Sequence, residues 1–153
     1  MMKRRNALLL ALLATQLCAC GGGDGDFEPV ELPQQRIRAS WDYTTLSETY
    51  VIRSEAQWEA TWTRHQPRSP GDVRPQIDFS RFMVLGITRG TASSGCFDVR
   101  ITKVIETGDD IRVEFQQSRP RPGSFCTASV EPLTDFVIVP ASSKPVTFVE
   151  KAA

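Results

Sequence analysis

The sequence contains little of what enzymes usually need: it has one histidine, His65, and four cysteines in 153 residues. No CxxC or HxxxH spacing occurs, which argues against a zinc site. No GxSxG segment occurs either, so the nucleophile elbow of α/β-hydrolases is absent. The glycine tract at residues 21–23 lacks the Lys-Ser/Thr pair of a phosphate-binding loop. The sequence therefore predicts no cofactor, no metal and no enzymatic activity.

Neither sign of charge is in excess, because the chain has 18 basic and 18 acidic residues. A nucleic-acid-binding domain would show a basic stripe, so nucleic acid is not expected as a partner. Long apolar runs are also lacking. The run at residues 7–14 is far shorter than the ~20 residues that span a bilayer as a helix. It has the length of the apolar part of a signal peptide.

The first twenty residues have the pattern of a bacterial lipoprotein signal peptide. Lys3, Arg4 and Arg5 precede the apolar run, and Leu17-Cys18-Ala19-Cys20 follows it. This last segment resembles the lipobox, with an aliphatic residue at −3 and a small one at −1 before the cysteine. The resemblance implies cleavage before Cys20, with a diacylglyceryl group on its thiol and a further acyl chain on its amine. Such chains anchor a protein stably to a membrane. An ordinary secretory signal that happens to end in cysteine is the alternative.

We therefore divide the chain into a signal peptide at residues 1–19, a flexible tether at 20–35 and one domain at 36–151. The tether begins with Gly-Gly-Gly-Asp-Gly-Asp, a composition that cannot pack. Gly21 rather than aspartate follows Cys20, which in Gram-negative lipoproteins implies export to the outer membrane. We expect a lipid-anchored protein of the cell envelope that faces the periplasm. Loss of the leader removes three basic residues and no acidic one, which leaves a net charge of −3.

Cys96 and Cys126 are the two cysteines that remain in the domain. In an oxidising compartment such a pair is typical of one disulfide. A Cys/His metal site is the alternative, but the chain offers it only His65.

One helix is expected from Ser54 to about His65. Ser54 and Gln57 have the spacing of a capping box, and the segment between Ser54 and His65 contains no glycine or proline. Trp58 and Trp62 are four residues apart and share one face. We interpret them as the core-facing stripe of an amphipathic helix; a ligand platform is the alternative.

Strands are expected in the rest of the domain. Apolar and polar residues alternate on both sides of Glu106-Thr107-Gly108-Asp109-Asp110, which predicts a β-hairpin with one buried face. A nearly continuous apolar run at residues 82–88 predicts a central strand that is buried on both faces. We count six or seven strands. The fold class is therefore α+β, a mostly antiparallel β-sheet with one packed amphipathic helix and one disulfide.

Three segments carry a resemblance to a known family over residues 49–149. They are the helix with Trp58 and Trp62, Ile77-Asp78-Phe79-Ser80 before a strand, and Gly95-Cys96-Phe97 at the start of the hairpin. Their order is similar to that of the PrcB-like family, named for an accessory lipoprotein subunit of a bacterial surface protease complex. Cys96 and Phe97 stand where family members usually have glycine and tyrosine. The resemblance implies a small accessory domain that binds or stabilises another envelope protein, such as a protease.

Two polar segments are the candidate protein-binding residues. One is a turn predicted at residues 89–95, and the other is a stiff basic loop. The candidates are Arg89, Thr91, Ser93, Ser94 and Gly95 in the turn, and Arg119 and Arg121 in the loop. Loops on a rigid scaffold commonly bind partners, and arginine captures carboxylates well.

Three other interpretations stay open. Both segments could be ordinary solvated loops. The protein could be a structural envelope lipoprotein without a specific ligand. It could also be a small hydrolase that uses Ser93 or Ser94 as nucleophile with His65 as base, since nucleophilic catalysis needs such a pair within reach.

Overall fold

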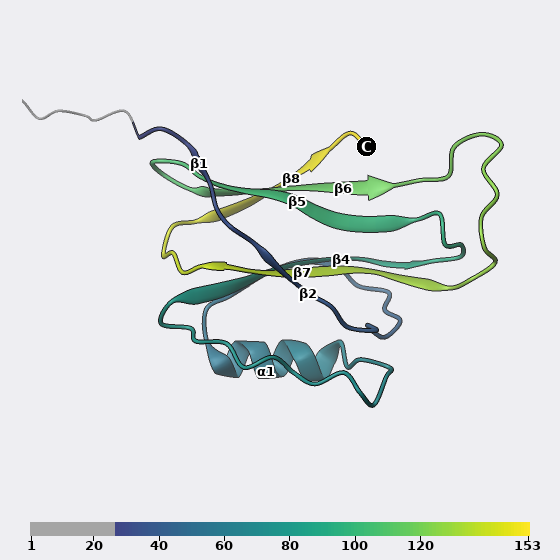
Figure 1. The fold of residues 1–153 in the computed structure, drawn as a ribbon, viewed down its shortest axis with the longest axis horizontal. Helices are drawn as coiled ribbons and strands as arrows, with labels where there is room; N and C mark the ends of the chain where they lie inside the picture. Colours follow the sequence, from purple (N-terminus) through teal and green to yellow (C-terminus); the bar gives the residue numbers. More distant parts are fainter. Residues whose placement is uncertain (1–26) are drawn as a thin grey trace, which may run out of the picture.

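The computed structural model describes residues 27–153. The predicted signal peptide, Cys20 and the first part of the predicted tether lie outside the described residues. The chain forms eight strands and one helix in the described part (Figure 1). The elements are β1 Val30–Glu31, β2 Gln35–Ile37, β3 Ser47–Ile52, α1 Glu55–Arg64, β4 Phe82–Ala92, β5 Asp98–Glu106, β6 Ile111–Ser118, β7 Glu131–Pro140 and β8 Val146–Lys151.

The strands form two four-stranded sheets, in the orders β1-β5-β6-β8 and β2-β7-β4-β3. Every pairing is antiparallel except that of β6 with β8. The two sheets pack face to face, and α1 covers the outer face of the second sheet (Figure 1). The predicted fold class is confirmed. The expected single sheet of six or seven strands is a sandwich of two sheets with eight.

Strand β4 is buried on both faces, as its apolar run predicts. Met83, Leu85 and Ile87 point between the two sheets, where they meet residues of β5, β6 and β7. Val84 points to the opposite face, toward the helix. Successive side chains of a strand point to opposite faces, so one strand serves both cores. This is why the segment shows no alternation of apolar and polar residues.

The second core lies between β4, β7 and the helix. Trp58 is fully buried and its ring lies 5.9 Å from that of Phe136. Trp62 is half-buried and packs edge-on against Trp58 and Trp41. A Cβ at Gly86 would overlap the ring of Phe136, so this glycine makes room for the aromatic cluster. The prediction that both helix tryptophans face the core is confirmed.

The start of the helix also follows the sequence. Ser54 caps it, and its side chain accepts a hydrogen bond from the Gln57 backbone N–H at 3.3 Å. The Gln57 side chain accepts in turn from the backbone N–H of Arg53, one residue earlier than a capping box would have it. Within residues 27–153, no helix is long and apolar enough to cross a bilayer.

The predicted start of the domain at residue 36 is too late. Val30 pairs with Glu106 in one sheet, and Gln35 pairs with Ile138 in the other. Residues 30–35 therefore belong to the domain and not to a tether. These two strands have two and three residues, and Pro33 separates them. Such short pieces have no measurable hydrophobic period, so only the neighbouring strands reveal them.

A candidate binding surface at the disulfide-clamped end

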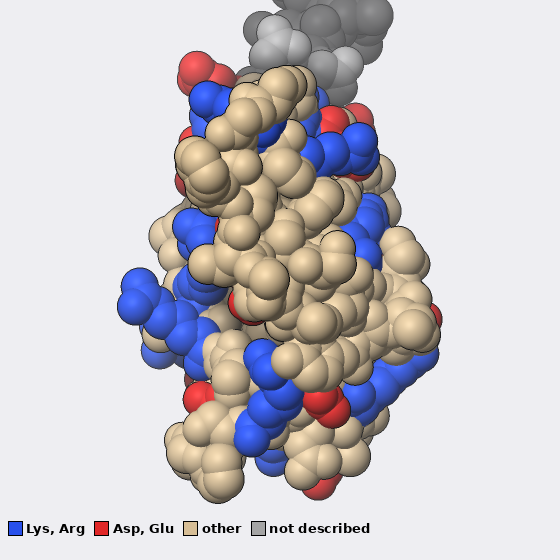
Figure 2. Space-filling model, turned by 90° about the vertical axis from the view of Figure 1, so that its right-hand side faces the viewer, with Lys and Arg blue, Asp and Glu red and all other residues tan. Residues whose placement is uncertain are grey.

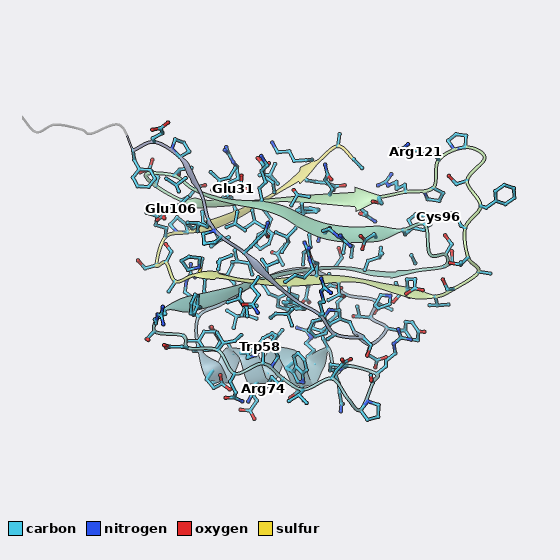
Figure 3. All side chains as sticks on the ribbon, in the orientation of Figure 1. Glu31, Trp58, Arg74, Cys96, Glu106 and Arg121 are labelled. Atoms are coloured by element: carbon cyan, nitrogen blue, oxygen red, sulfur yellow. A yellow bond between two sulfur atoms is a disulfide. The ribbon has the colours of Figure 1, made fainter. Side chains whose placement is uncertain are left out.

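The predicted binding loops meet at one end of the sandwich. A disulfide joins Cys96 to Cys126 across a Cα–Cα distance of 5.3 Å, as predicted. Beside it, the Gly95 N–H donates a hydrogen bond to the Thr127 carbonyl at 3.1 Å. Figure 3 shows Cys96 and Arg121 at this same end. We call residues 93–97 and 119–130 together the clamped end.

Gly95 has a packing role at the clamped end. A Cβ there would overlap the side chain of Thr127. Glycine therefore allows the two segments to approach beside the disulfide. The candidate binding role of Gly95 stays a prediction, but the close approach by itself explains the residue type.

The polar turn predicted at residues 89–95 is shorter than expected. Strand β4 continues to Ala92, so Arg89 and Thr91 lie in a strand and only residues 93–97 form the turn. The pairing of β4 with β7 shifts between Thr88 and Thr91, and Gly90 has a φ of 81° within this bulge. Glycine in a polar segment is typical of a turn, but it also permits a bulge, through which a strand continues.

The candidate arginines line two different hollows. Arg89 and Thr91 line one of about 820 Å³, together with Tyr43, Thr45 and Val130. We call it the Arg89 groove. Arg119 and Arg121 line a second hollow of about 690 Å³ that contains Cys96 and reaches Lys151 at the end of β8. The structure therefore brings Arg119 and Arg121 together with the disulfide and leaves Arg89 in a groove of its own. Neither groove is lined by Ser93, Ser94 or Gly95.

Large apolar side chains are exposed beside the disulfide and in the Arg89 groove. Phe125, the residue before Cys126, is 104% exposed. Val130 and Tyr43 are about half exposed and line the Arg89 groove. Figure 2 looks at this end and shows a largely uncharged centre with basic and acidic side chains around its margins. The sequence analysis missed these three residues. An apolar residue between Ser124 and a disulfide cysteine, in a loop rich in proline, was the available signal for Phe125.

His65 is part of the core and not of the clamped end. It is 1% exposed, and its Nε2 lies 2.7 Å from the Tyr50 hydroxyl. The Tyr50 hydroxyl also donates to Glu48 at 2.8 Å. Burial lowers the pKa of His65, and the Arg64 guanidinium adds to this effect. Burial and the hydrogen-bonded Glu48 carboxylate raise the pKa of Tyr50 to about 12.

The predicted alternative of a Ser93 or Ser94 nucleophile with His65 is wrong. His65 packs on Phe136 and Tyr50, both of which pair with Gly86 in the middle of β4. Ser93 follows the end of that strand, seven residues beyond Gly86. At about 3.3 Å per residue, the two positions are separated by roughly 20 Å. His65 can therefore not take a proton from either serine.

No protein-family model, curated protein or solved structure matches this chain. In residues 27–153, no three side chains of His, Cys, Asp or Glu come together as a metal ion would require.

Proposed function

We propose that this protein is a lipid-anchored, non-catalytic accessory protein of the cell envelope, and that its clamped end binds another envelope protein. The observation that carries the proposal is Phe125, a fully exposed aromatic side chain next to a disulfide. Binding interfaces obtain much of their affinity from a few aromatic and arginine side chains. A side chain on a braced loop also loses less conformational entropy when it binds.

The charge around Phe125 indicates the chemistry of the partner. Arg119 and Arg121 are exposed, and neither forms an ion pair in the described part of the chain. Guanidinium groups bind carboxylates through paired hydrogen bonds. A partner that fits would present an apolar pocket for Phe125 with acidic residues at its rim. The family resemblance suggests a protease of the envelope as this partner.

The position of Phe27, the first described residue, supports an orientation in which the clamped end points away from the membrane. Phe27 lies against Gly108 in the β5–β6 turn, under the ammonium group of Lys144. That turn is at the opposite end of the hairpin from Cys96 (Figures 1 and 3). Cys20 precedes Phe27 by seven residues, a reach of at most about 25 Å. An acylated Cys20 would thus hold the β5–β6 turn near the membrane and present the clamped end to proteins of the periplasm.

The test is capture of a partner from solubilised membranes after crosslinking. Phe125→Ser should abolish co-purification of the partner without changing the melting temperature, because the side chain makes no internal packing. Val73→Ser is the matched control, since Val73 is an apolar residue that is 81% exposed elsewhere. If Phe125→Ser retains every interactor of the wild type, the clamped end is not the binding surface. Intact mass of the extracted protein tests the acylation of Cys20.

A further inference from the structure

Arg89 is a half-buried arginine without an acidic partner in residues 27–153. Its Cζ lies 4.9 Å from the centre of the Phe115 ring, and its Nη1 donates to the Thr88 carbonyl at 3.2 Å. These contacts hold the guanidinium in place. Among residues 27–153, its Nε and Nη2 have no hydrogen-bond partner, and neither is a buried unsatisfied atom. The two nitrogens are therefore accessible from outside the protein, and Arg89 is one of the residues that line the Arg89 groove.

Arg36, at the edge between the sheets, is an arginine whose donors are paired with a carboxylate of the domain. Its Nε and Nη2 lie 2.8 and 3.2 Å from the two oxygens of Asp135. The same Nη2 donates to the Ile101 carbonyl, and the Ile101 N–H donates to Asp135. This arginine is saturated by a paired carboxylate within the fold. Arg89 also donates to a backbone carbonyl, and it stacks on Phe115, but it lacks the carboxylate.

The wall of the Arg89 groove is held in one shape. The Thr91 hydroxyl donates to the Thr44 carbonyl at 2.8 Å and accepts from the Thr44 N–H at 3.1 Å. This reciprocal pair fixes the segment before β3 against β4. Tyr43 is held from the other side by Arg68, whose guanidinium stacks on the ring and donates to its hydroxyl. A guest would meet a groove that needs little rearrangement.

We propose that the Arg89 groove binds a peptide carboxylate, with the Nε and Nη2 of Arg89 as its paired donors. The groove lining contains one cation and no carboxylate, which matches a single negative charge better than a phosphate dianion. Val130 and Tyr43 supply apolar surface for the side chain of the same peptide. The carboxylate comes from a chain terminus or from an Asp or Glu side chain. This inference rests on the proposed function because both take a protein segment as the ligand. The Arg89 groove itself is not lined by Phe125, Arg119 or Arg121.

The experiment is a titration of the processed, ¹⁵N-labelled chain in detergent, followed by NMR. Three peptides are compared: acetyl-Ala-Ala-Val with a free terminal carboxylate, the same peptide as its terminal amide, and acetyl-Ala-Glu-Ala amide. We expect the chemical shifts of the Thr45 and Thr91 amides and of the Arg89 Nε–H to change saturably with a peptide that contains a carboxylate. The amide of acetyl-Ala-Ala-Val, which has no carboxylate, should cause no such change. Which of the two carboxylates binds more tightly identifies the source.

Three variants decide the role of Arg89. Arg89→Gln should weaken binding at least about ten-fold, since charge-assisted hydrogen bonds are lost. Arg81→Gln is the matched control, because Arg81 also stacks on a phenylalanine but at the other end of β4. Val130→Glu places a carboxylate at the exposed rim of the groove and should also weaken binding, without removing the contacts of Arg89.

The outcomes separate this inference from the proposed function. Retained peptide binding in the Arg119→Ser, Arg121→Ser double variant assigns the carboxylate to the Arg89 groove. The proposal is overturned if no carboxylate peptide shifts the groove, if the amidated peptide binds equally well, or if Arg89→Gln binds as tightly as Arg81→Gln. Loss of partner capture in Phe125→Ser, with peptide binding intact, would leave both inferences standing.

Discussion

The two ends of the sandwich differ in whether their charged side chains have partners within the domain. At the β5–β6 turn, Lys144 donates to the Thr107 carbonyl at 2.6 Å, pairs with Glu106 at 2.9 Å and stacks on Phe27. Asp110 accepts hydrogen bonds from Thr107 and Thr147, which hold the pKa of its carboxyl below the usual value. Lys144, Glu106 and Asp110 therefore have partners within the domain.

The clamped end leaves comparable groups without partners. Within the described range, Arg119 and Arg121 form no ion pair, although Glu150 lines the same hollow, and Phe125 is fully exposed. The difference separates an end whose charged groups have partners within the domain from the end that we propose binds another protein. A disulfide and the hydrogen bond from Gly95 to Thr127 join the two segments of this end.

The largest expected effect comes from removing the disulfide. The Cys96→Ser, Cys126→Ser double variant should lose ~2–4 kcal/mol of unfolding free energy, because the open chain gains entropy in the unfolded state. Denaturant titration measures the loss. Hydrogen exchange should rise mainly at the clamped end and leave the β5–β6 turn protected. Equal loss of protection at both ends would show that the bridge braces the whole sandwich rather than one end.

Removal of one positive charge should lower the stability of the protein more at the β5–β6 turn than at the clamped end. Lys144→Met breaks a half-buried ion pair and a hydrogen bond, so it should lower stability by ~1–2 kcal/mol. Arg121→Met removes the same charge from an unpartnered side chain and should change stability by less than about 0.5 kcal/mol. Thermal unfolding of both variants under one buffer is the measurement. If Arg121→Met is the more destabilising change, the contrast between the ends is wrong.

The smallest effect is expected from the protonation of His65. This residue lies in the core next to the helix, so its protonation should affect both ends of the sandwich alike. Its folded-state pKa is lowered by burial, whereas the unfolded chain titrates near about 6.5. Below that pH the unfolded chain binds a proton that the folded one resists, so stability is full above about pH 6.5 and falls as the pH drops. Unfolding titrations at pH 7 and pH 5 check this. His65→Gln should reduce the difference; an unchanged difference would assign it to other groups.

The sequence by itself determined the helix, the central hairpin, the disulfide and the class of the fold. Ser54 and Gln57 define a helix start through local hydrogen bonds, and the alternation on both sides of Gly108 defines the hairpin. The pairing of Cys96 with Cys126 followed because only two cysteines remained after residue 20. These are local patterns or counts, which need no knowledge of what lies across the fold.

Only the tertiary structure decided the number of sheets, the first two strands and the composition of the site. Residues 30–31 and 35–37 are strands because β5 and β7 offer them partners, not because of their own composition. Arg89 left the predicted turn because a bulge at Gly90 lets β4 continue. Arg36 pairs with Asp135, whereas Arg89 lines a groove that contains no carboxylate. In both cases, residues far away along the chain decide whether the arginine has an acidic partner. Register and burial are set by long-range pairing, so short sequence windows do not contain them.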